Sequence, residues 1–196
     1  MHLVIGGDGL VGSALRSKLN SRHLAWQATS RRAIPTEAWP GPVLLDLAAI
    51  DWQYLPMITR GTVYLVAYMS KFIDCESNPL AWRVNVDAQI ELARQYSRHG
   101  AFVVFISSEA VEKAGGTAYG RQKAHVESYM RTIDAAIIRP SRIPPNRVDY
   151  FAKVVVDIGV ERKPGLMRWI WVAPDHDIDP WRSQKKLVDH SLAVQA

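Results

Sequence analysis

Cysteine is almost absent from this sequence, and so are long apolar runs. Cys75 is the single cysteine among 196 residues, so the chain can form neither an internal disulfide nor a cysteine-based metal site. The longest apolar runs resemble strands, as at residues 101–106, and fall far short of the ~20 residues that a membrane helix requires. No basic segment of the kind that begins a signal peptide precedes the first apolar residues. We therefore expect a cytoplasmic protein with no metal site and no membrane partner.

Basic residues exceed acidic ones without forming a nucleic-acid-binding motif. Lys and Arg total 24, Asp and Glu total 19, and the formal net charge is +5. Such a chain attracts anions. The basic residues are scattered, however, and no helix-turn-helix, zinc-finger or aromatic RNA-binding pattern accompanies them. We expect no nucleic-acid partner, because a phosphate-rich cofactor needs only a few of these cations.

Short apolar runs alternate with longer amphipathic segments along most of the chain. This alternation predicts an α/β fold in which helices cover both faces of a doubly wound parallel sheet. The expected strands span residues 3–5, 24–29, 43–45, 63–66, 101–106 and 135–138. The expected helices lie near residues 10–20, 79–98 and 118–132.

The pattern beyond residue 146 is less regular. Residues 149–163 fit a helix or a strand, residues 166–174 favour a buried strand, and residues 181–196 favour a terminal helix. A loop that holds His176 among aspartates lacks the paired spacing of a metal site. Three tryptophans either line a pocket or, as is more common, pack in the core or an interface: Trp169, Trp171 and Trp181.

The opening residues, HLVIGGDGLVGSAL, place a glycine-rich turn between an expected strand and an expected helix. Glycine is needed there if the backbone is to approach a pyrophosphate closely and then enter a helix whose N-terminal amides face the anion. The glycines fit both GxGxxG and GxxGxxG, and their context predicts a dinucleotide site rather than a turn without a ligand. The expected cofactor contacts in this turn are Gly6, Gly7, Gly9, Leu10, Val11 and Gly12.

The end of the second expected strand favours one nicotinamide cofactor over the other. NAD-binding folds carry an acidic residue about 20 residues after the glycines, where it binds the ribose hydroxyls. In this sequence Ser30, Arg31 and Arg32 occupy that place. A guanidinium can pair with a 2′-phosphate that a carboxylate would repel, so the sequence favours NADP over NAD. The alternative is that the two arginines are solvated loop charges.

A second group of residues predicts acid–base chemistry. Tyr119 and Lys123 are four residues apart on an expected helix and therefore share one face. Ser107 and Ser108 end an apolar strand at the carboxyl edge of the sheet, where ligands bind in doubly wound folds. A nearby ammonium lowers the pKa of a phenol, and this would make Tyr119 a usable acid or base at neutral pH.

Together these motifs resemble the short-chain dehydrogenase/reductase superfamily, most closely its extended branch of NAD-dependent epimerases and dehydratases and dTDP-4-dehydrorhamnose reductases. The resemblance covers about residues 2 to 141. Besides the glycine turn and YGRQK, it rests on VLLDLA, VYLVAY, NPLAWRVNVDAQIELA and IIRPS in the same order. It implies an NADP-binding Rossmann domain at residues 1–145. A short C-terminal substrate-binding segment at residues 146–196 would be integrated with that domain.

The resemblance also implies roles for individual residues. Tyr119 would be the proton donor or base, and Lys123 would bind the nicotinamide ribose and tune Tyr119. Ser108, rather than Ser107, would polarise the substrate oxygen, and Asn85 would be mainly structural. Further cofactor contacts would come from Asp46 and Leu47 at the adenine, and from Val66 and Ala67 at the ribose.

The sequence departs from the family pattern where the substrate would bind. Few residues follow Ser141, Tyr119 comes only eleven positions after Ser108, and Arg142-Ile143-Pro144-Pro145 replaces Val-Tyr-Gly-Pro. The substrate pocket is therefore expected to be small, open or completed by another chain.

We expect an NADP(H)-dependent oxidoreductase that moves hydride to or from a small carbonyl or alcohol substrate, with sugar nucleotides as one candidate class. Two alternatives stay open: a non-catalytic NADP-binding sensor or partner subunit, and a small flavin or quinone reductase. The helices near residues 79–98 and 118–132 resemble the pair that often forms the family's dimer interface, so we expect a homodimer.

Overall fold

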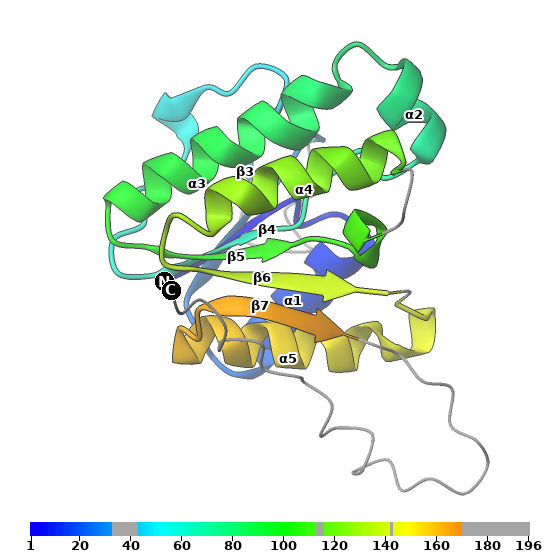
Figure 1. Ribbon diagram of the computed structural model, residues 1–196. Helices are drawn as coiled ribbons and strands as arrows, with labels where there is room; N and C mark the ends of the chain where they lie inside the picture. The colour runs from blue at the N-terminus through cyan, green and yellow to red at the C-terminus, as the bar shows by residue number, and fades with distance from the viewer. Residues whose placement is uncertain (33–42, 113–115, 142, 170–196) are drawn as a thin grey trace, which may run out of the picture.

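Seven parallel strands form one sheet in the computed structural model, which describes residues 1–32, 43–112, 116–141 and 143–169. The strand order is β3-β2-β1-β4-β5-β6-β7, and every neighbouring pair is parallel (Figure 1). This doubly wound order is that of a Rossmann fold, so the expected fold class is confirmed. The strands are β1 (His2–Ile5), β2 (Trp26–Ser30), β3 (Val43–Leu44), β4 (Thr62–Leu65), β5 (Phe102–Ile106), β6 (Ala135–Pro140) and β7 (Gly165–Trp169).

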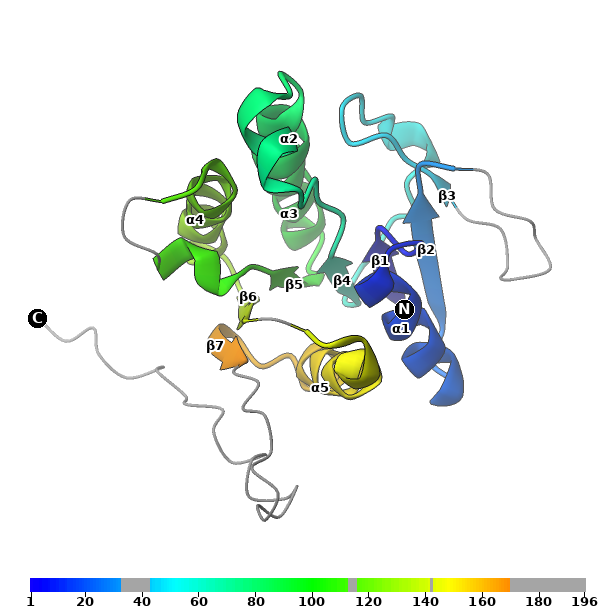
Figure 2. The ribbon, with the colours of Figure 1, turned by 90° about the vertical axis from the view of Figure 1, so that its right-hand side faces the viewer.

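Helices cover both faces of this sheet, as Figure 2 shows. One face carries α1 (Leu10–Ser21) and α5 (Val148–Glu161). The other carries α2 (Phe72–Ser77), α3 (Ala88–Arg98) and α4 (Ala118–Met130). A parallel sheet covered in this way buries both of its faces, and its central strands consist of apolar residues without alternation.

The core is divided by the sheet into two layers. Successive side chains of a strand point to opposite faces. In β4, Val63 and Leu65 pack in the layer of α3 and α4, whereas Tyr64 packs in the layer of α1 and α5. In β5, Phe105 belongs to the first layer and Val104 to the second. Burial on both faces therefore explains the uninterrupted apolar run of β5.

The carboxyl ends of the central strands meet at one edge of the sheet. β1 continues into Gly6, β4 continues into Val66 and Ala67, and β5 continues into Ser107. Strands are added in one direction from β1 to β3 and in the other direction from β4 to β7, so the winding reverses between β1 and β4. Ligands of doubly wound sheets bind at such a reversal.

Two helical segments differ from the expected ones. The helix expected near residues 79–98 is regular only over α3, because Arg83–Asp87 form a turn of π-helix. In that turn the Asn85 side chain bonds to the backbone of Met69, which ties the helix start to another segment. The six-residue α2 was not predicted, since it is too short to show a helical period. Residues 149–163, for which helix and strand were both open, form most of α5.

Residues 170–196 lie outside the described part of the chain. The predicted terminal helix, Trp171, Trp181 and the loop around His176 all fall there. Of the described helices, none combines the length and the apolar character needed to cross a membrane. The described residues also contain no group of His, Cys, Asp and Glu side chains that could hold a metal ion.

Candidate functional site

The glycine turn after β1 is shaped by close backbone contacts. Gly6 has a φ of +95°, and a Cβ added there would lie 2.6 Å from the Cβ of Ala67. A Cβ added to Gly12 would lie 2.0 Å from the carbonyl oxygen of Gly6. Both distances are too short for any side chain, so these two glycines are required by the fold of the turn itself.

Gly9 differs from these two glycines. A Cβ added to Gly9 would meet only the Gly6 carbonyl oxygen, at an ordinary 3.7 Å, so the protein's own packing does not require glycine there. Gly9 is exposed and is the residue before α1, whose N-terminus has no side-chain cap. The first amides of a helix lack partners within the helix and attract anions. Glycine at this position therefore fits a ligand that approaches the backbone of Gly9, Leu10 and Val11.

The end of β2 is tied directly to the glycine turn. The amide of Gly7 donates to the Thr29 carbonyl at 2.8 Å, and the amide of Gly6 donates to the Thr29 hydroxyl at 3.1 Å. The next residue, Ser30, is buried and accepts a hydrogen bond from the Arg32 amide at 3.0 Å. Arg31 and Arg32 are exposed. Two cationic side chains thus follow the strand beside the turn.

The ends of β3 and β4 complete the same edge. The Asp46 carboxylate is exposed and accepts a hydrogen bond from the Ala48 amide at 2.9 Å, while Leu47 is buried. The amides of Val66 and Ala67 both donate to the carbonyl of Ile5, at 3.1 and 2.9 Å. The implied cofactor contacts in these segments therefore lie at, or shortly after, the carboxyl ends of β1, β2, β3 and β4.

Ser108, Tyr119 and Lys123 lie together at the end of β5. The Lys123 side chain is buried, its ammonium donates to the Ile106 carbonyl at 2.6 Å, and it lies 5.8 Å from the centre of the Tyr119 ring. The Ser108 side chain interacts with the Tyr119 phenol and lowers its pKa. Close approach of the two segments depends on Gly120, because a Cβ there would lie 2.4 Å from the Ala110 carbonyl oxygen. The three residues predicted from the sequence as an acid–base group are therefore neighbours.

Burial sets the protonation of these side chains. It raises the pKa of Tyr119, and the interaction with Ser108 opposes this shift. It lowers the pKa of Lys123 well below its usual value, and the Glu127 carboxylate opposes that shift. The expected lowering of the pKa of Tyr119 by Lys123 is not found: burial has the largest effect on the phenol, and the side chain that opposes it is Ser108. The phenol is consequently protonated at neutral pH.

Two aromatic residues at this site were not predicted as site residues. The Tyr68 ring lies edge-on to Tyr119 at 5.5 Å between centroids, and its face lies 3.4 Å from the Lys123 ammonium. The Phe72 ring also lies edge-on to Tyr119, at 5.6 Å. Tyr68 directly follows the implied contacts Val66 and Ala67, but nothing in its spacing distinguished it from a core tyrosine. An ammonium over an aromatic face is stabilised by the ring quadrupole.

Asn85 holds the segment after β4 against α4. Its side-chain oxygen accepts from the Met69 amide at 2.9 Å, and its nitrogen donates to the Gln122 side chain at 2.8 Å. Gln122 in turn donates to the Cys75 carbonyl at 3.2 Å. Asn85 and Gln122 are both buried, which agrees with the structural role that the resemblance implied for Asn85.

The family of the chain follows from its sequence over most of its length. Residues 1–164 match the model of the family described as RmlD substrate binding domain. The chain belongs to this family. The expected place in the extended short-chain dehydrogenase/reductase branch, near the dTDP-4-dehydrorhamnose reductases, is thereby confirmed. Among curated proteins, none matches this member of the family.

Solved structures share the fold of this RmlD-family chain. A dTDP-4-dehydrorhamnose reductase from Yersinia enterocolitica is 17% identical, with a TM-score of 0.69 over 85% of this chain and 73% of that one. A hypothetical dTDP-4-dehydrorhamnose reductase from Sulfolobus tokodaii is 20% identical, with a TM-score of 0.67 over 86% of this chain and 76% of that one.

A third solved structure contains a nicotinamide cofactor. It is a short-chain dehydrogenase/reductase superfamily protein from Agrobacterium tumefaciens with bound NAD, 22% identical, with a TM-score of 0.61 over 71% of this chain. The match covers 48% of that protein, so this chain spans about half of its length. At such identities these three likenesses establish the fold.

Proposed function

We propose that this chain is an NADP(H)-dependent oxidoreductase that moves hydride between the nicotinamide and a carbonyl or alcohol carbon. The observation that carries the proposal is the grouping of Ser108, Tyr119 and Lys123 at the same sheet edge as the glycine turn. Membership of the RmlD family supports it, as do the names of the solved relatives, two of which are dTDP-4-dehydrorhamnose reductases. Sugar nucleotides are therefore the first substrates to test. The homodimer through α3 and α4 stays a prediction.

The residues of the turn fit a dinucleotide. The amides of Leu10 and Val11 and the open space over Gly9 would hold the pyrophosphate, and Arg31 with Arg32 would hold the 2′-phosphate of NADP. Ser30, Asp46 and Leu47 would contact the adenosine, and Val66 with Ala67 the nicotinamide ribose. The bound nicotinamide supplies or accepts the hydride.

The chain's own residues then donate a proton to the substrate oxygen and polarise the carbonyl group. Tyr119 is protonated at neutral pH, which is the form needed to donate a proton to a carbonyl oxygen during reduction. Ser108 donates a hydrogen bond to the same oxygen and polarises the carbonyl. Lys123 holds the ribose and offers positive charge as the phenol becomes a phenolate. In the direction of oxidation, Tyr119 takes the proton back from the alcohol.

Alanine substitutions at Gly9 and Gly12 distinguish an effect on NADPH binding from an effect on the stability of the fold. Gly9→Ala is expected to lower the free energy of unfolding by about 1 kcal/mol or less, because the added Cβ makes only an ordinary contact. It is expected to raise the Kd for NADPH about tenfold or more, since the methyl group occupies space needed by the pyrophosphate. Isothermal titration with NADPH and urea denaturation measure the two quantities.

Gly12→Ala serves as the matched comparison for Gly9→Ala. Its added Cβ would lie 2.0 Å from the Gly6 carbonyl oxygen, so overpacking is expected to cost about 1–3 kcal/mol of unfolding free energy. A Gly9→Ala protein that binds NADPH as tightly as the wild type would remove the turn from the cofactor site.

Cofactor choice is expected to depend on the two exposed arginines after β2. Replacing Arg31 and Arg32 together by alanine removes charge-assisted hydrogen bonds to the 2′-phosphate. The Kd for NADPH should then rise about ten- to hundredfold, while the Kd for NADH stays the same. Arg98→Ala, at an exposed arginine at the end of α3, is the control and should change neither value. Equal losses for NADPH and NADH, or none, would contradict the preference for NADP.

A further inference from the structure

We propose that Glu127, held by Arg139, is a positioning residue of the acid–base site: it fixes Ser107, and thereby Ser108, and it places a negative charge one helical turn from Lys123. This inference rests on the proposed function, because it concerns how that site is held in place. None of the motifs considered in the sequence included Glu127 as a site residue.

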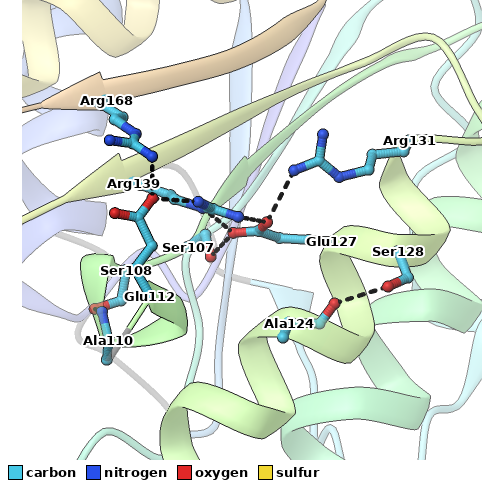
Figure 3. Close-up of polar contacts among 10 residues, drawn as sticks. All are labelled: Ser107, Ser108, Ala110, Glu112, Ala124, Glu127, Ser128, Arg131, Arg139 and Arg168. Carbon is cyan, nitrogen blue, oxygen red and sulfur yellow. Dashed lines mark hydrogen bonds and ion pairs between the residues drawn. The ribbon is translucent and has the colours of Figure 1, made fainter. Parts of the chain in front are cut away.

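The Glu127 carboxylate is buried and fully engaged by hydrogen bonds (Figure 3). One oxygen accepts from the Ser107 hydroxyl at 2.5 Å and from Arg139 Nε at 2.7 Å, and the other accepts from Arg139 Nη2 at 2.5 Å. Arg131 lies further from the carboxylate, at 3.5 Å. Three elements therefore meet at this carboxylate: α4 through Glu127, β6 through Arg139 and the end of β5 through Ser107.

Arg139 is held from a second side. Its Nη1 donates to Glu112 at 2.5 Å, and Glu112 also pairs with Arg168 on β7 at 2.6 Å. The Arg139 side chain is only 10% exposed. A forked guanidinium bonded to two carboxylates has little freedom to turn. Arg139 thus fixes the position of the Glu127 carboxylate from β6.

Glu127 in turn fixes the point at which the chain leaves β5. The amide of Ser107 donates to the Ile138 carbonyl at 2.7 Å, and its hydroxyl donates to Glu127, so both its backbone and its side chain are anchored. Ser108 follows directly, and its side chain interacts with the Tyr119 phenol. A buried ion pair is often no more stabilising than apolar side chains of similar volume. The anchoring of Ser107 gives this buried pair a role that apolar residues could not fill.

Glu127 also faces Lys123 along α4. Tyr119, Lys123 and Glu127 are spaced four residues apart and lie along one face of the helix. The other groups around the Lys123 ammonium are the Tyr68 and Phe105 rings, the Cys75 thiol of α2 and the Ile106 carbonyl. Among these neighbours the Glu127 carboxylate has the largest raising effect on the pKa of Lys123 against burial, and the Cys75 thiol raises it further.

The test compares the pH dependence of NADPH affinity in the wild type and in Glu127→Gln. Lys123 is proposed to hold the ribose as an ammonium, so affinity should fall as the pH rises and Lys123 loses its proton. Without the carboxylate, the midpoint of this fall should move to lower pH by about one unit. The Kd is measured by fluorescence titration with NADPH. Glu91→Gln removes the same charge from a partly exposed pair between Glu91 of α3 and Arg83, and it should leave the midpoint in place.

Ser107→Ala provides a second test that does not disturb the buried ion pair. It removes only the hydrogen bond between Ser107 and Glu127, so the midpoint should stay at the wild-type pH. With the carbonyl substrate on which wild-type turnover is greatest, kcat should fall about tenfold at an unchanged KM for NADPH. This variant decides the outcome if Glu127→Gln fails to fold.

The outcomes separate this inference from the proposed function. A wild type that binds no NADPH contradicts both. A wild type whose affinity does not change with pH removes Lys123 from cofactor binding and overturns the charge role of Glu127 with it. Two outcomes overturn the inference and leave the proposed function standing. In the first, NADPH affinity falls with rising pH in the wild type and the midpoint is the same in Glu127→Gln. In the second, Ser107→Ala keeps the full kcat.

Discussion

Replacing Tyr119 by phenylalanine is expected to lower kcat for NADPH-dependent carbonyl reduction by about 10²–10⁴-fold. The substitution removes only the hydroxyl, which is the proposed proton donor and the partner of Ser108. The ring and its edge contacts with Tyr68 and Phe72 stay in place, so the Kd for NADPH should be unchanged. Steady-state kinetics and an NADPH titration measure the two effects separately.

Tyr129→Phe is the matched control for Tyr119→Phe. Tyr129 lies on the same helix, and its ring contacts the Arg94 guanidinium at 5.8 Å rather than any residue of the site. Its kcat should equal that of the wild type. If Tyr119→Phe also retained full turnover, the phenol would have no part in the reaction, and the non-catalytic alternative of an NADP-binding sensor would gain support.

Replacing Arg139 by methionine is expected to lower the free energy of unfolding by about 3–5 kcal/mol. The Glu127 carboxylate, 3% exposed, would lose its main counter-charge and stay buried. Removing one partner of a buried pair costs much more than the pair itself contributes, because the other charge is left without compensation. Urea denaturation at neutral pH measures the change.

Arg131→Met tests whether burial is the reason for that loss. Arg131 pairs with the same carboxylate at 3.5 Å, but its side chain is 50% exposed. An exposed pair of this kind contributes at most about 1 kcal/mol. Equal losses in Arg131→Met and Arg139→Met, or a loss in Arg139→Met below about 1 kcal/mol, would mean that the Glu127 carboxylate does not depend on Arg139.

The fold was predictable because local signals agree along the chain. The apolar runs that became β1, β4 and β5 are short and are separated by helical segments, and this order permits few arrangements other than a parallel sheet with helices on both faces. The glycine turn was recognisable because only glycine fits at Gly6 and Gly12, where an added Cβ would clash with the backbone. The candidate site residues near strand ends could be grouped from the sequence for a different reason: a parallel sheet brings those ends to one edge.

The remainder of the site depends on contacts between residues far apart in the sequence, which the spacing of residues within a motif cannot predict. Glu127 meets Ser107 from a position twenty residues later in the chain, and Arg139 joins them from another strand, so no local motif contains the three. The side chain of Tyr68 could be placed against Lys123 only once β4 and α4 were packed. The pKa of Tyr119 was misjudged because the spacing of YxxxK indicates a nearby ammonium but carries no information on the burial that raises the pKa of the phenol.

A crystal structure of the protein with NADPH tests the central claim most directly. We expect the pyrophosphate on the amides that follow Gly9, the 2′-phosphate beside Arg31 and Arg32, and the nicotinamide ring within contact of the Tyr119 phenol. A crystal grown at saturating NADPH in which the dinucleotide lies elsewhere, or in which the nicotinamide is out of reach of Tyr119, would contradict the account.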